Sequence, residues 1–549
     1  MKLLYSFRGS LKLFPSALFI VFLTASCVKE NVDLRHISNT VDWRPKYAMP
    51  LAYGSLSLKE IVNAIDTNGI MKEYPNGLLY LSYHNRIFSK TVDSIITIPN
   101  QQFQQLFTGL ALPGVFPPND SIKYNSSSNY NFNFNNGAEI DSINFKNGTL
   151  VFTVRSEFLH TGSITITTPT MTKNSVPFKI TMPINKLDGS FADSIFQSLT
   201  GYKLNFNAIN QIPVTYSVVL RKDGGAPILA TQKISIDIDI RQTAFKSIFG
   251  YFSSFQLIDN FPSKVLIDVY QNIIATNAKV ADPRLNICYN NSFGIPIRIQ
   301  LNNVRTFSKS SGYTPVTLNP SVNPIDVLFP NINQLGTLMK DTVRIDKNTS
   351  SIATAFNSSP EEFLANITAT TNIGGKTHNN FALDTSRFDV DMNVELPMDF
   401  QASNYRRVDT IVDFDLSTIT KDYSIINKLA IYGTFTNSIP CDLGLQVYLV
   451  DSLYTKVDSL FTLADQPVIK GGEIDSNGNV IKPGSKISQF IYSGDRIKPL
   501  SKVKHALLYA NISTAGGGLT YVKFYSKYLL NLSLGVQIDL KITSLDQFK

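Results

Sequence analysis

The stretch Ile234-Ser235-Ile236-Asp237-Ile238-Asp239-Ile240 decides the fold class of this chain. Its four isoleucines alternate with polar residues, which places the isoleucines on one face of a β-strand and the polar side chains on the other. Residues 389–396 and 534–542 repeat this design. Half-buried strands of this kind are typical of antiparallel sheets with one face on a core and one in water. We therefore predict an all-β protein.

Length and composition extend this prediction to several domains. The chain has 549 residues, which is too long for a single core. A charged fraction of 17%, with 24 Tyr and 36 Phe, favours strands. We expect several antiparallel β-sandwich, immunoglobulin-like domains with a few short helices. The expected boundaries give a β-rich domain at 42–136 and sandwiches at 137–250, 251–402 and 403–549.

Local signals place individual elements within these domains. Ser57-Leu58-Lys59-Glu60 has the spacing of a capping box, and Ser359-Pro360-Glu361-Glu362 also predicts a helix start. Asn147-Gly148 and Asn477-Gly478 predict hairpins, and residues 94–98 predict a strand. The low-complexity run at 124–137 predicts an edge strand or a linker beside the first boundary. Trp43, the single tryptophan, is expected to fill a core.

The amino-terminal segment predicts how the chain is targeted. Lys2, Arg8 and Lys12 precede an apolar run at residues 13–23, and Leu23-Thr24-Ala25-Ser26-Cys27 follows. We interpret residues 1–26 as a signal peptide, Cys27 as the site of lipid attachment, with acyl chains such as palmitate, and 27–41 as a tether. The alternative is an ordinary secretory signal with an incidental cysteine. Thr24 departs from the leucine that usually stands three residues before the lipidated cysteine.

Four proline-containing segments form a weak repeat. Each has a polar residue, an aliphatic residue and a proline, followed by alternating residues, with the prolines at Pro177, Pro213, Pro296 and Pro440. Proline cannot donate a ladder hydrogen bond, so it suits the first residue of a strand. We expect these prolines to begin strands in related sheets.

Several of these motifs together resemble the large outer-membrane lipoproteins of Bacteroidota, a group without an assigned function. The motifs are the segment ending at Cys27, Trp43-Arg44-Pro45, Met49-Pro50-Leu51 and the repeated proline starts. The resemblance implies a β-rich envelope protein anchored in the outer membrane. Val28-Lys29-Glu30-Asn31 resembles the signal that sends such lipoproteins to the cell surface, so the surface is favoured over the periplasmic face.

A short motif of Asp, then Ser or Thr, then an aliphatic residue occurs eight times. It resembles the O-glycosylation motif of Bacteroidota envelope proteins, and a sugar there would be bulky and confined to the surface. The alternative is an Asp-Ser turn before a strand. The candidate O-glycosylation residues are Ser94, Ser121, Ser142, Ser194, Thr342, Thr410, Ser452 and Ser459.

No pattern in the sequence predicts a catalytic residue, a metal site or a cofactor. The five histidines are isolated, and Asp389, Asp391 and Asn393 do not form an EF-hand because Val394 replaces the required glycine. The net charge of +8 is mild, and no basic cluster with aromatics indicates nucleic acid. Cys288 and Cys441 could form a disulfide or remain two buried thiols.

These observations predict a lipid-anchored outer-membrane protein, held at the membrane through amino-terminal acyl chains, with a non-catalytic binding or structural role. The expected partners are a glycan or another envelope protein. One alternative is an accessory subunit of an outer-membrane import or secretion complex. A second alternative is a glycan-active hydrolase, because paired carboxylates are assembled in space and leave no sequence motif.

Overall fold

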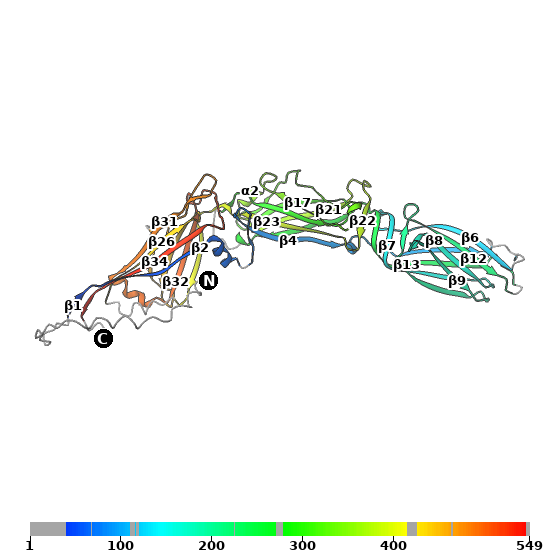
Figure 1. The fold of residues 1–549 in the computed structure, drawn as a ribbon, viewed down its shortest axis with the longest axis horizontal. Coiled ribbons are helices and arrows are strands. Elements are labelled where there is room, and N and C mark those ends of the chain that lie inside the picture. The colour runs from blue at the N-terminus through cyan, green and yellow to red at the C-terminus, as the bar shows by residue number, and fades with distance from the viewer. Residues whose placement is uncertain are drawn as a thin grey trace.

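The computed structural model describes residues 40–66, 68–109, 116, 120–223, 226–270, 278–413, 425–462 and 465–544. Strands make up 61% of the structure and helices 7%, which confirms the all-β prediction. Three β-units lie end to end in an elongated, bent molecule (Figure 1). We call them the proximal unit (residues 40–66 and 399–544), the middle unit (68–96 and 252–398) and the distal unit (97–251).

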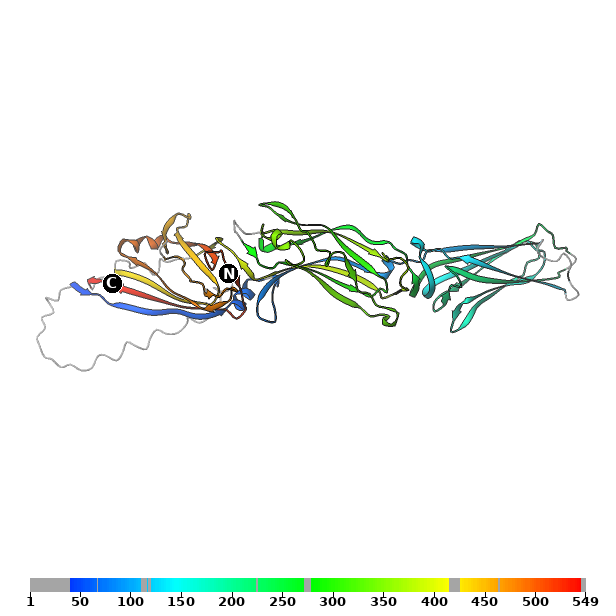
Figure 2. The same ribbon diagram turned by 90° about the horizontal axis from the view of Figure 1, so that it is seen from above.

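The chain runs outward from the proximal unit to the distal unit and then returns. On the way out, β2 (Lys46–Ser57) and β4 (Leu79–Thr91) each join a sheet that the returning chain completes. β2 pairs with β34 (Leu529–Leu540), and β4 pairs with β23 (Arg387–Pro397). The expected domain at 42–136 is therefore wrong, since its strands are distributed over all three units. The view from above shows the blue outgoing strands beside red and yellow-green returning ones (Figure 2).

The proximal unit is a sandwich of two four-stranded sheets, with orders β2-β34-β26-β31 and β25-β32-β27-β28. Its core contains Leu449, Tyr492 and Val503. β1 (Thr40–Trp43) pairs with β35 (Ile542–Ser544) at the free end of the unit. The other strands are β25 (Tyr405–Ile411), β26 (Ile426–Asn437), β27 (Cys441–Val450), β28 (Lys456–Ser459), β31 (Gly484–Ser493) and β32 (His505–Thr514).

The middle unit packs a sheet of order β14-β21-β17-β18, with β19 beside β17, against a sheet of order β20-β16-β23-β4-β3. Ile287, Ile299 and Met392 lie in the core between them. The strands are β3 (Met71–Glu73), β14 (Gln256–Leu266), β16 (Arg284–Asn291), β17 (Ile297–Ser308), β18 (Gly312–Pro315), β19 (Ile325–Val327), β20 (Met339–Ile345) and β21 (Glu362–Thr371).

The distal unit places β10, β7, β13 and β5 on one side and β9, β8, β12 and β6 on the other. The alternating isoleucines lie in β13 (Lys233–Tyr251) and are all buried, as their period predicts. The strands are β5 (Gln101–Thr108), β6 (Ser121–Asn131), β7 (Glu139–Ser156), β8 (Gly162–Lys173), β9 (Val176–Ile184), β10 (Phe191–Ser198), β11 (Lys203–Asn205) and β12 (Gln211–Arg221).

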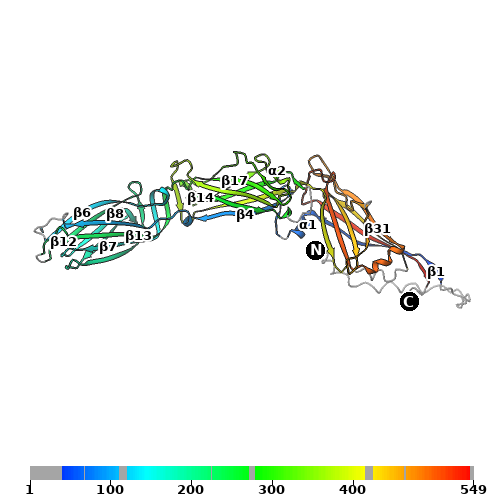
Figure 3. The ribbon, with the colours of Figure 1, turned by 180° about the vertical axis from the view of Figure 1, so that it is seen from behind.

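Two joints connect the units through paired strands. β13 extends from the distal unit to pair with β22 (Asn380–Leu383), and one hydrophobic core runs through both units. A three-stranded sheet of β15 (Lys279–Val280), β24 (Asp399–Gln401) and β33 (Val522–Lys523) joins the middle and proximal units. The view from behind shows the same three-unit arrangement (Figure 3).

The described α-helices are short. α1 (Leu58–Ile65) begins with the predicted capping box, in which the Glu60 N–H donates to Ser57 Oγ at 3.1 Å and the Ser57 N–H donates to Glu60 Oε2 at 2.7 Å. α2 (Ile352–Phe356) was not predicted. Among the described residues no helix has the length and apolarity to cross a membrane.

Four local predictions are wrong for identifiable reasons. The helix expected from Ser359 is instead the start of β21, because Phe363, Ala365, Ile367 and Ala369 alternate into the core. Residues 94–98 end a 3₁₀ turn and form no strand. Asn147-Gly148 lies at a register shift within the continuous strand β7. Trp43 lies on the short two-stranded β1–β35 ribbon and is 51% exposed.

Two other predictions are resolved. The low-complexity run lies mostly in β6, an edge strand, and marks no domain boundary. Asn477-Gly478 turns a hairpin between β29 (Glu473–Ile474) and β30 (Val480–Lys482), as predicted.

The repeated prolines lie near strand starts but do not occupy one equivalent place. Pro296 and Pro440 immediately precede β17 and β27. Pro177 and Pro213 instead lie inside β9 and β12. Pro213 is tolerated there because β8 pairs with β12 only from Thr215 onward, so one side of the strand needs no donor at Pro213.

Candidate functional site

A shallow hollow opens where the distal unit meets the middle unit. Its volume is about 440 Å³, which lies within the range of small-ligand sites. Strands β7 and β13 form part of its wall, and the turns beside β11 and after β22 complete it. The lining residues are Asn144, Phe145, Gly201, Tyr202, Lys246, Ser247, Leu383 and Asp384.

Tyr202 is the half-exposed aromatic residue of this hollow, and its position is fixed from several sides. Its N–H donates to the Leu199 carbonyl at 3.0 Å, and its carbonyl accepts from the Phe145 N–H at 2.9 Å. The Phe178 ring meets the Tyr202 ring edge-on at 5.8 Å between centroids. Lys173 Nζ lies 5.6 Å from the Tyr202 ring centroid. Tyr202 therefore forms a rigid ring at the edge of the hollow.

The polar groups of the hollow supply both donors and acceptors. The Asn144 amide donates to Ser247 Oγ at 2.5 Å. Asp384 pairs with Lys146 at 2.8 Å, and this hydrogen bond raises the pKa of the lysine. Among the described residues that line the hollow, Asp384 is the one carboxylate, and it is already paired. An aromatic ring beside hydroxyl, amide and charged hydrogen-bonding groups suits a polyhydroxylated ligand.

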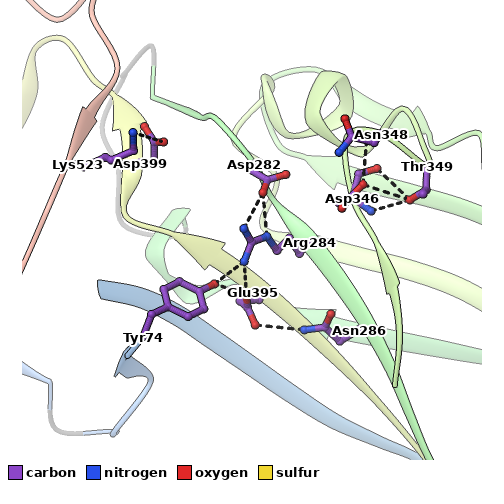
Figure 4. Close-up of polar contacts among 10 residues, drawn as sticks. All are labelled: Tyr74, Asp282, Arg284, Asn286, Asp346, Asn348, Thr349, Glu395, Asp399 and Lys523. Carbon is purple, nitrogen blue, oxygen red and sulfur yellow. Dashed lines mark hydrogen bonds and ion pairs between the residues drawn. The ribbon is translucent and has the colours of Figure 1, made fainter. Parts of the chain in front are cut away.

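A second polar cluster lies at the end of the middle unit that faces the proximal unit (Figure 4). Arg284 pairs with Glu395 at 2.9 Å and with Asp282 at 2.8 Å. The Tyr74 hydroxyl donates to Glu395 Oε1 and accepts from Arg284 Nη1 at 2.8 Å. The Asn286 amide donates to Glu395 Oε2 at 3.2 Å. The cluster thereby joins β16, β23 and the turn after β3 at one point.

The pKa shifts of this cluster have structural causes. Burial by itself lowers the pKa of Arg284, but its hydrogen bonds to Glu395 and Asp282 outweigh burial and raise it. Burial and the Glu395 hydrogen bond raise the pKa of Tyr74. Arg284 and Glu395 thus neutralise one another, and Glu395 accepts from three donors. We assign this cluster to holding the joint.

The remaining contacts drawn in Figure 4 surround the same joint. Asp399 in β24 lies 3.8 Å from Lys523 in β33, and burial raises the pKa of Asp399. The adjacent Phe400 and Phe524 rings stack at 4.7 Å with planes 5° apart. Asp346 accepts from the Asn348 N–H at 2.9 Å and closes a loop. These contacts stiffen the passage between the middle and proximal units.

The structure does not bring the predicted site residues together. Cys27 lies outside the described residues, as do the signal peptide and most of the tether. The candidate O-glycosylation residues are spread over all three units. Ser94, Thr342 and Ser452 are exposed, whereas Ser121, Ser142, Ser194, Thr410 and Ser459 are half-buried.

The Asp of this motif has a structural task in four copies. Asp193, Asp341, Asp409 and Asp458 each accept a hydrogen bond from the N–H of the next residue, at 2.7 to 2.8 Å. All four lie in edge strands: β10, β20, β25 and β28. The carboxylate therefore accepts a backbone N–H of the edge strand, which is then not free to pair with another chain. It also places a charge at the sheet edge, which discourages such pairing.

The cysteines and histidines form no metal site within the described residues. Cys288 in β16 and Cys441 in β27 belong to different units and are free thiols. His84 Nδ1 contacts Asn393 Oδ1 at 2.6 Å, and Arg86 pairs with Asp391 at 3.2 Å, so β4 and β23 are joined there by polar pairs. No group of three or more His, Cys, Asp or Glu in the described ranges could hold a metal ion.

The sequence analysis missed the hollow. Tyr202, Asn144 and Lys246 belong to no motif, and they become neighbours only through the pairing of β7 with β11 and β13. The nearest sequence signal is the Thr200-Gly201 turn beside an aromatic residue, which by itself predicts only a turn.

Comparison with known proteins adds no family. No family model matches the chain. No curated protein matches it either.

Among solved structures, one similar chain is a protein of Parabacteroides distasonis, a member of the Bacteroidota, that is thought to be secreted. It is 11% identical over 90% of this chain and 99% of that chain, with a TM-score of 0.26. Another is VP2 of infectious bursal disease virus in a subviral particle. It is 10% identical over 88% of this chain and 86% of that chain, with a TM-score of 0.12. Similarity at this level establishes neither a shared fold nor a shared function.

Proposed function

We propose that this protein is a lipid-anchored stalk of the outer membrane, favoured at the cell surface, with a non-catalytic binding role. Acyl chains on Cys27 would hold the proximal unit at the membrane. The rest of the molecule would then carry the Tyr202 hollow away from the bilayer. The expected ligand is a glycan, because the hollow places the Tyr202 ring beside hydroxyl, amide and charged hydrogen-bonding groups.

The observation that carries this proposal is the outward-and-return path of the chain. Thr40, the first described residue, pairs with Ser544 at the free end of the proximal unit. The distal unit lies at the opposite end of the molecule (Figure 1). An anchor attached upstream of Thr40 would therefore hold one end only. The two packed joints support a rigid spacer between the anchor and the distal unit.

Metabolic labelling with an alkyne fatty acid tests the anchor. Labelled wild-type protein should be recovered in the outer membrane. Cys27→Ala should remove the label and either release the protein or leave its signal peptide uncut. Equal labelling of the two proteins would contradict acylation at Cys27.

Affinity electrophoresis in gels containing surface or dietary polysaccharides tests the hollow. A polysaccharide that retards the wild type should retard Tyr202→Ala at least tenfold less, since stacking on an aromatic ring supplies much of the contact area. Phe196→Ala is the matched control, because Phe196 is an exposed ring of the distal unit outside the hollow. Equal loss in both variants would contradict a site at Tyr202.

An accessory-subunit role is the second candidate, and exposed apolar side chains on an edge strand favour it. Ile487 and Ile491 lie on β31, at the edge of a proximal sheet. A pull-down from solubilised outer membranes distinguishes the candidates. A partner that co-purifies in stoichiometric amount with the wild type, but not with the double variant Ile487→Ser and Ile491→Ser, would support the complex over the free-standing binder.

The O-glycosylation proposal now applies best to the exposed motif residues. Ser94 and Ser452 lie outside strands, where a sugar would disturb no sheet. Intact-mass analysis of protein purified from its native host should show added hexose mass that Ser94→Ala and Ser452→Ala reduce. An unmodified mass would leave the motif with its edge-strand role alone.

A further inference from the structure

A stripe of apolar side chains emerges from the proximal unit at the end where the described chain begins. We define the stripe as Trp43, Tyr47 and Met49, whose exposed fractions are 51%, 48% and 53%. Trp43 lies in β1, and Tyr47 and Met49 lie in β2. These are large side chains on an edge strand, which soluble proteins usually keep polar.

The register shows that the stripe lies on one face. Trp43 pairs with Ile542, Tyr47 with Ile538 and Met49 with Val536. The partners are separated by even numbers of residues along the returning chain, so they share a face of that chain. Ile542 and Val536 are buried, whereas the stripe opposite them is half uncovered. The stripe therefore continues the inner face of the proximal sandwich out to its open end.

The stripe is surrounded by three exposed cations, one of which, Lys46, lies opposite the buried Asp539 in the register. Arg44, Lys46 and Lys541 are exposed next to it, and Asp42 pairs with Arg44 at 2.9 Å. Trp and Tyr beside Lys and Arg are typical of segments at the membrane–water interface. The aromatic rings there occupy the headgroup level, and the cations approach anionic lipid phosphates.

The position of the stripe also fits a bilayer. Cys27 precedes Thr40 by 13 positions. A chain of that length spans at most about 45 Å when fully extended, at about 3.3–3.6 Å per residue. Acyl chains on Cys27 would therefore keep β1 near the lipid surface, while the distal unit lies at the other end of the molecule (Figure 1).

We propose that Trp43, Tyr47 and Met49 insert into the headgroup region of the lipid bilayer and form a second, non-covalent contact that orients the stalk. The inference rests on the proposed lipid anchor. The acyl chains alone would attach the proximal unit at a single point upstream of Thr40. With the stripe inserted, the edge formed by β1 and β2 lies on the bilayer and sets the direction of the middle and distal units.

Trp43 is the only tryptophan of the chain, so its fluorescence reports on the stripe alone. The experiment uses acylated full-length protein in vesicles of phosphatidylcholine and phosphatidylglycerol, with and without brominated phosphatidylcholine. We expect brominated lipid to quench Trp43 emission at least twofold. Tyr47→Ser with Met49→Ser should reduce this quenching. Tyr53→Ser should leave it unchanged, because Tyr53 pairs with Ser533 on the opposite face of β2.

The outcomes separate this inference from the anchor. Protein that floats with the vesicles but shows unquenched Trp43 emission would overturn the stripe and leave the anchor intact. Emission that is already blue-shifted without lipid would also overturn it, since another part of the chain would then cover Trp43. Protein that fails to float would overturn the anchor. In that case the stripe is tested on protein that is attached to nickel-chelating lipid through an amino-terminal histidine tag. Quenching of Trp43 emission by brominated lipid is still expected there.

Discussion

Ile299 and Gln300 are neighbours in β17 that face opposite sides of the sheet. Ile299 is 0% exposed, and Gln300 is exposed. Ile299→Asp should lower the free energy of unfolding by several kcal/mol, because a carboxylate would be buried without a partner or forced to take up a proton. Gln300→Asp should change it by about 0.5 kcal/mol or less.

Thermal unfolding of these two variants measures the difference. Lys179→Asp, on the exposed face of β9, is a second neutral control. Arg298→Asp is not neutral, since Arg298 pairs with Asp326 and the substitution would oppose two carboxylates. Similar melting of Ile299→Asp and Gln300→Asp would show that the faces of β17 are wrongly assigned.

Gly294 lies where the Phe381 ring crosses the backbone. A Cβ at this position would come within 2.2 Å of two ring atoms of Phe381. Gly294→Ala should therefore destabilise the middle unit by about 1–3 kcal/mol through overpacking. Gly54→Ala is the control, because a Cβ added at Gly54 would meet no atom within 4 Å. Equal urea midpoints for the two variants would contradict the close approach.

Cys441 is a half-buried free cysteine whose reactivity tests the environment of its thiol. Burial raises the pKa of the Cys441 thiol from 9.0 to about 12, so almost no thiolate exists at pH 8. Native protein should thus react with iodoacetamide at Cys441 far more slowly than urea-unfolded protein. Because the folded pKa is the higher one, this thiol stabilises the fold below about pH 9, and that contribution is lost between pH 9 and 12. Fast labelling of native Cys441 would contradict the raised pKa of its thiol.

At the scale of elements, the Asp residues of the edge strands carry a testable role. Asp193 accepts the Ser194 N–H in β10. Asp193→Val should expose that donor and remove the charge, so dimers and larger species should increase at high concentration. Asp193→Asn keeps an acceptor and should show an intermediate effect. Analytical ultracentrifugation measures this, and an unchanged monomer in Asp193→Val would contradict the role.

The elements that the sequence predicted correctly are those with a local cause. The isoleucines at 234–240 define one face of a strand by their period of two. The Ser57 and Glu60 side chains accept backbone N–H groups at the start of α1 without help from distant residues. The helix expected at Ser359 failed because a strand pattern downstream outweighed a good cap. Asn147-Gly148 failed because β13 pairs along both sides of it and keeps β7 continuous.

At the scale of the whole molecule, the boundary expected at residues 136/137 was wrong, because the proximal and middle units are each assembled from outgoing and returning parts of the chain, whereas the distal unit is one continuous segment. No local pattern records that β2 will pair with β34 or β4 with β23. The Tyr202 hollow depends on the pairing of β7 with β11 and β13, and the stripe opposite Ile538 and Val536 depends on the pairing of β2 with β34. What the sequence could predict was the β class; the amino-terminal anchor stays a prediction.

The most direct test of the outward-and-return path is pulsed electron paramagnetic resonance on spin-labelled pairs, in a chain whose Cys288 and Cys441 are replaced by Ala. Ser55 and Asn531 are directly paired and exposed, whereas Asn129 lies in β6 of the distal unit. The structure predicts a short distance between labels at Ser55→Cys and Asn531→Cys. It predicts a distance between labels at Ser55→Cys and Asn129→Cys that is too long for both residues to lie in one unit. A short Ser55–Asn129 distance with a long Ser55–Asn531 distance would show that residues 42–136 form a separate domain and would contradict the stalk.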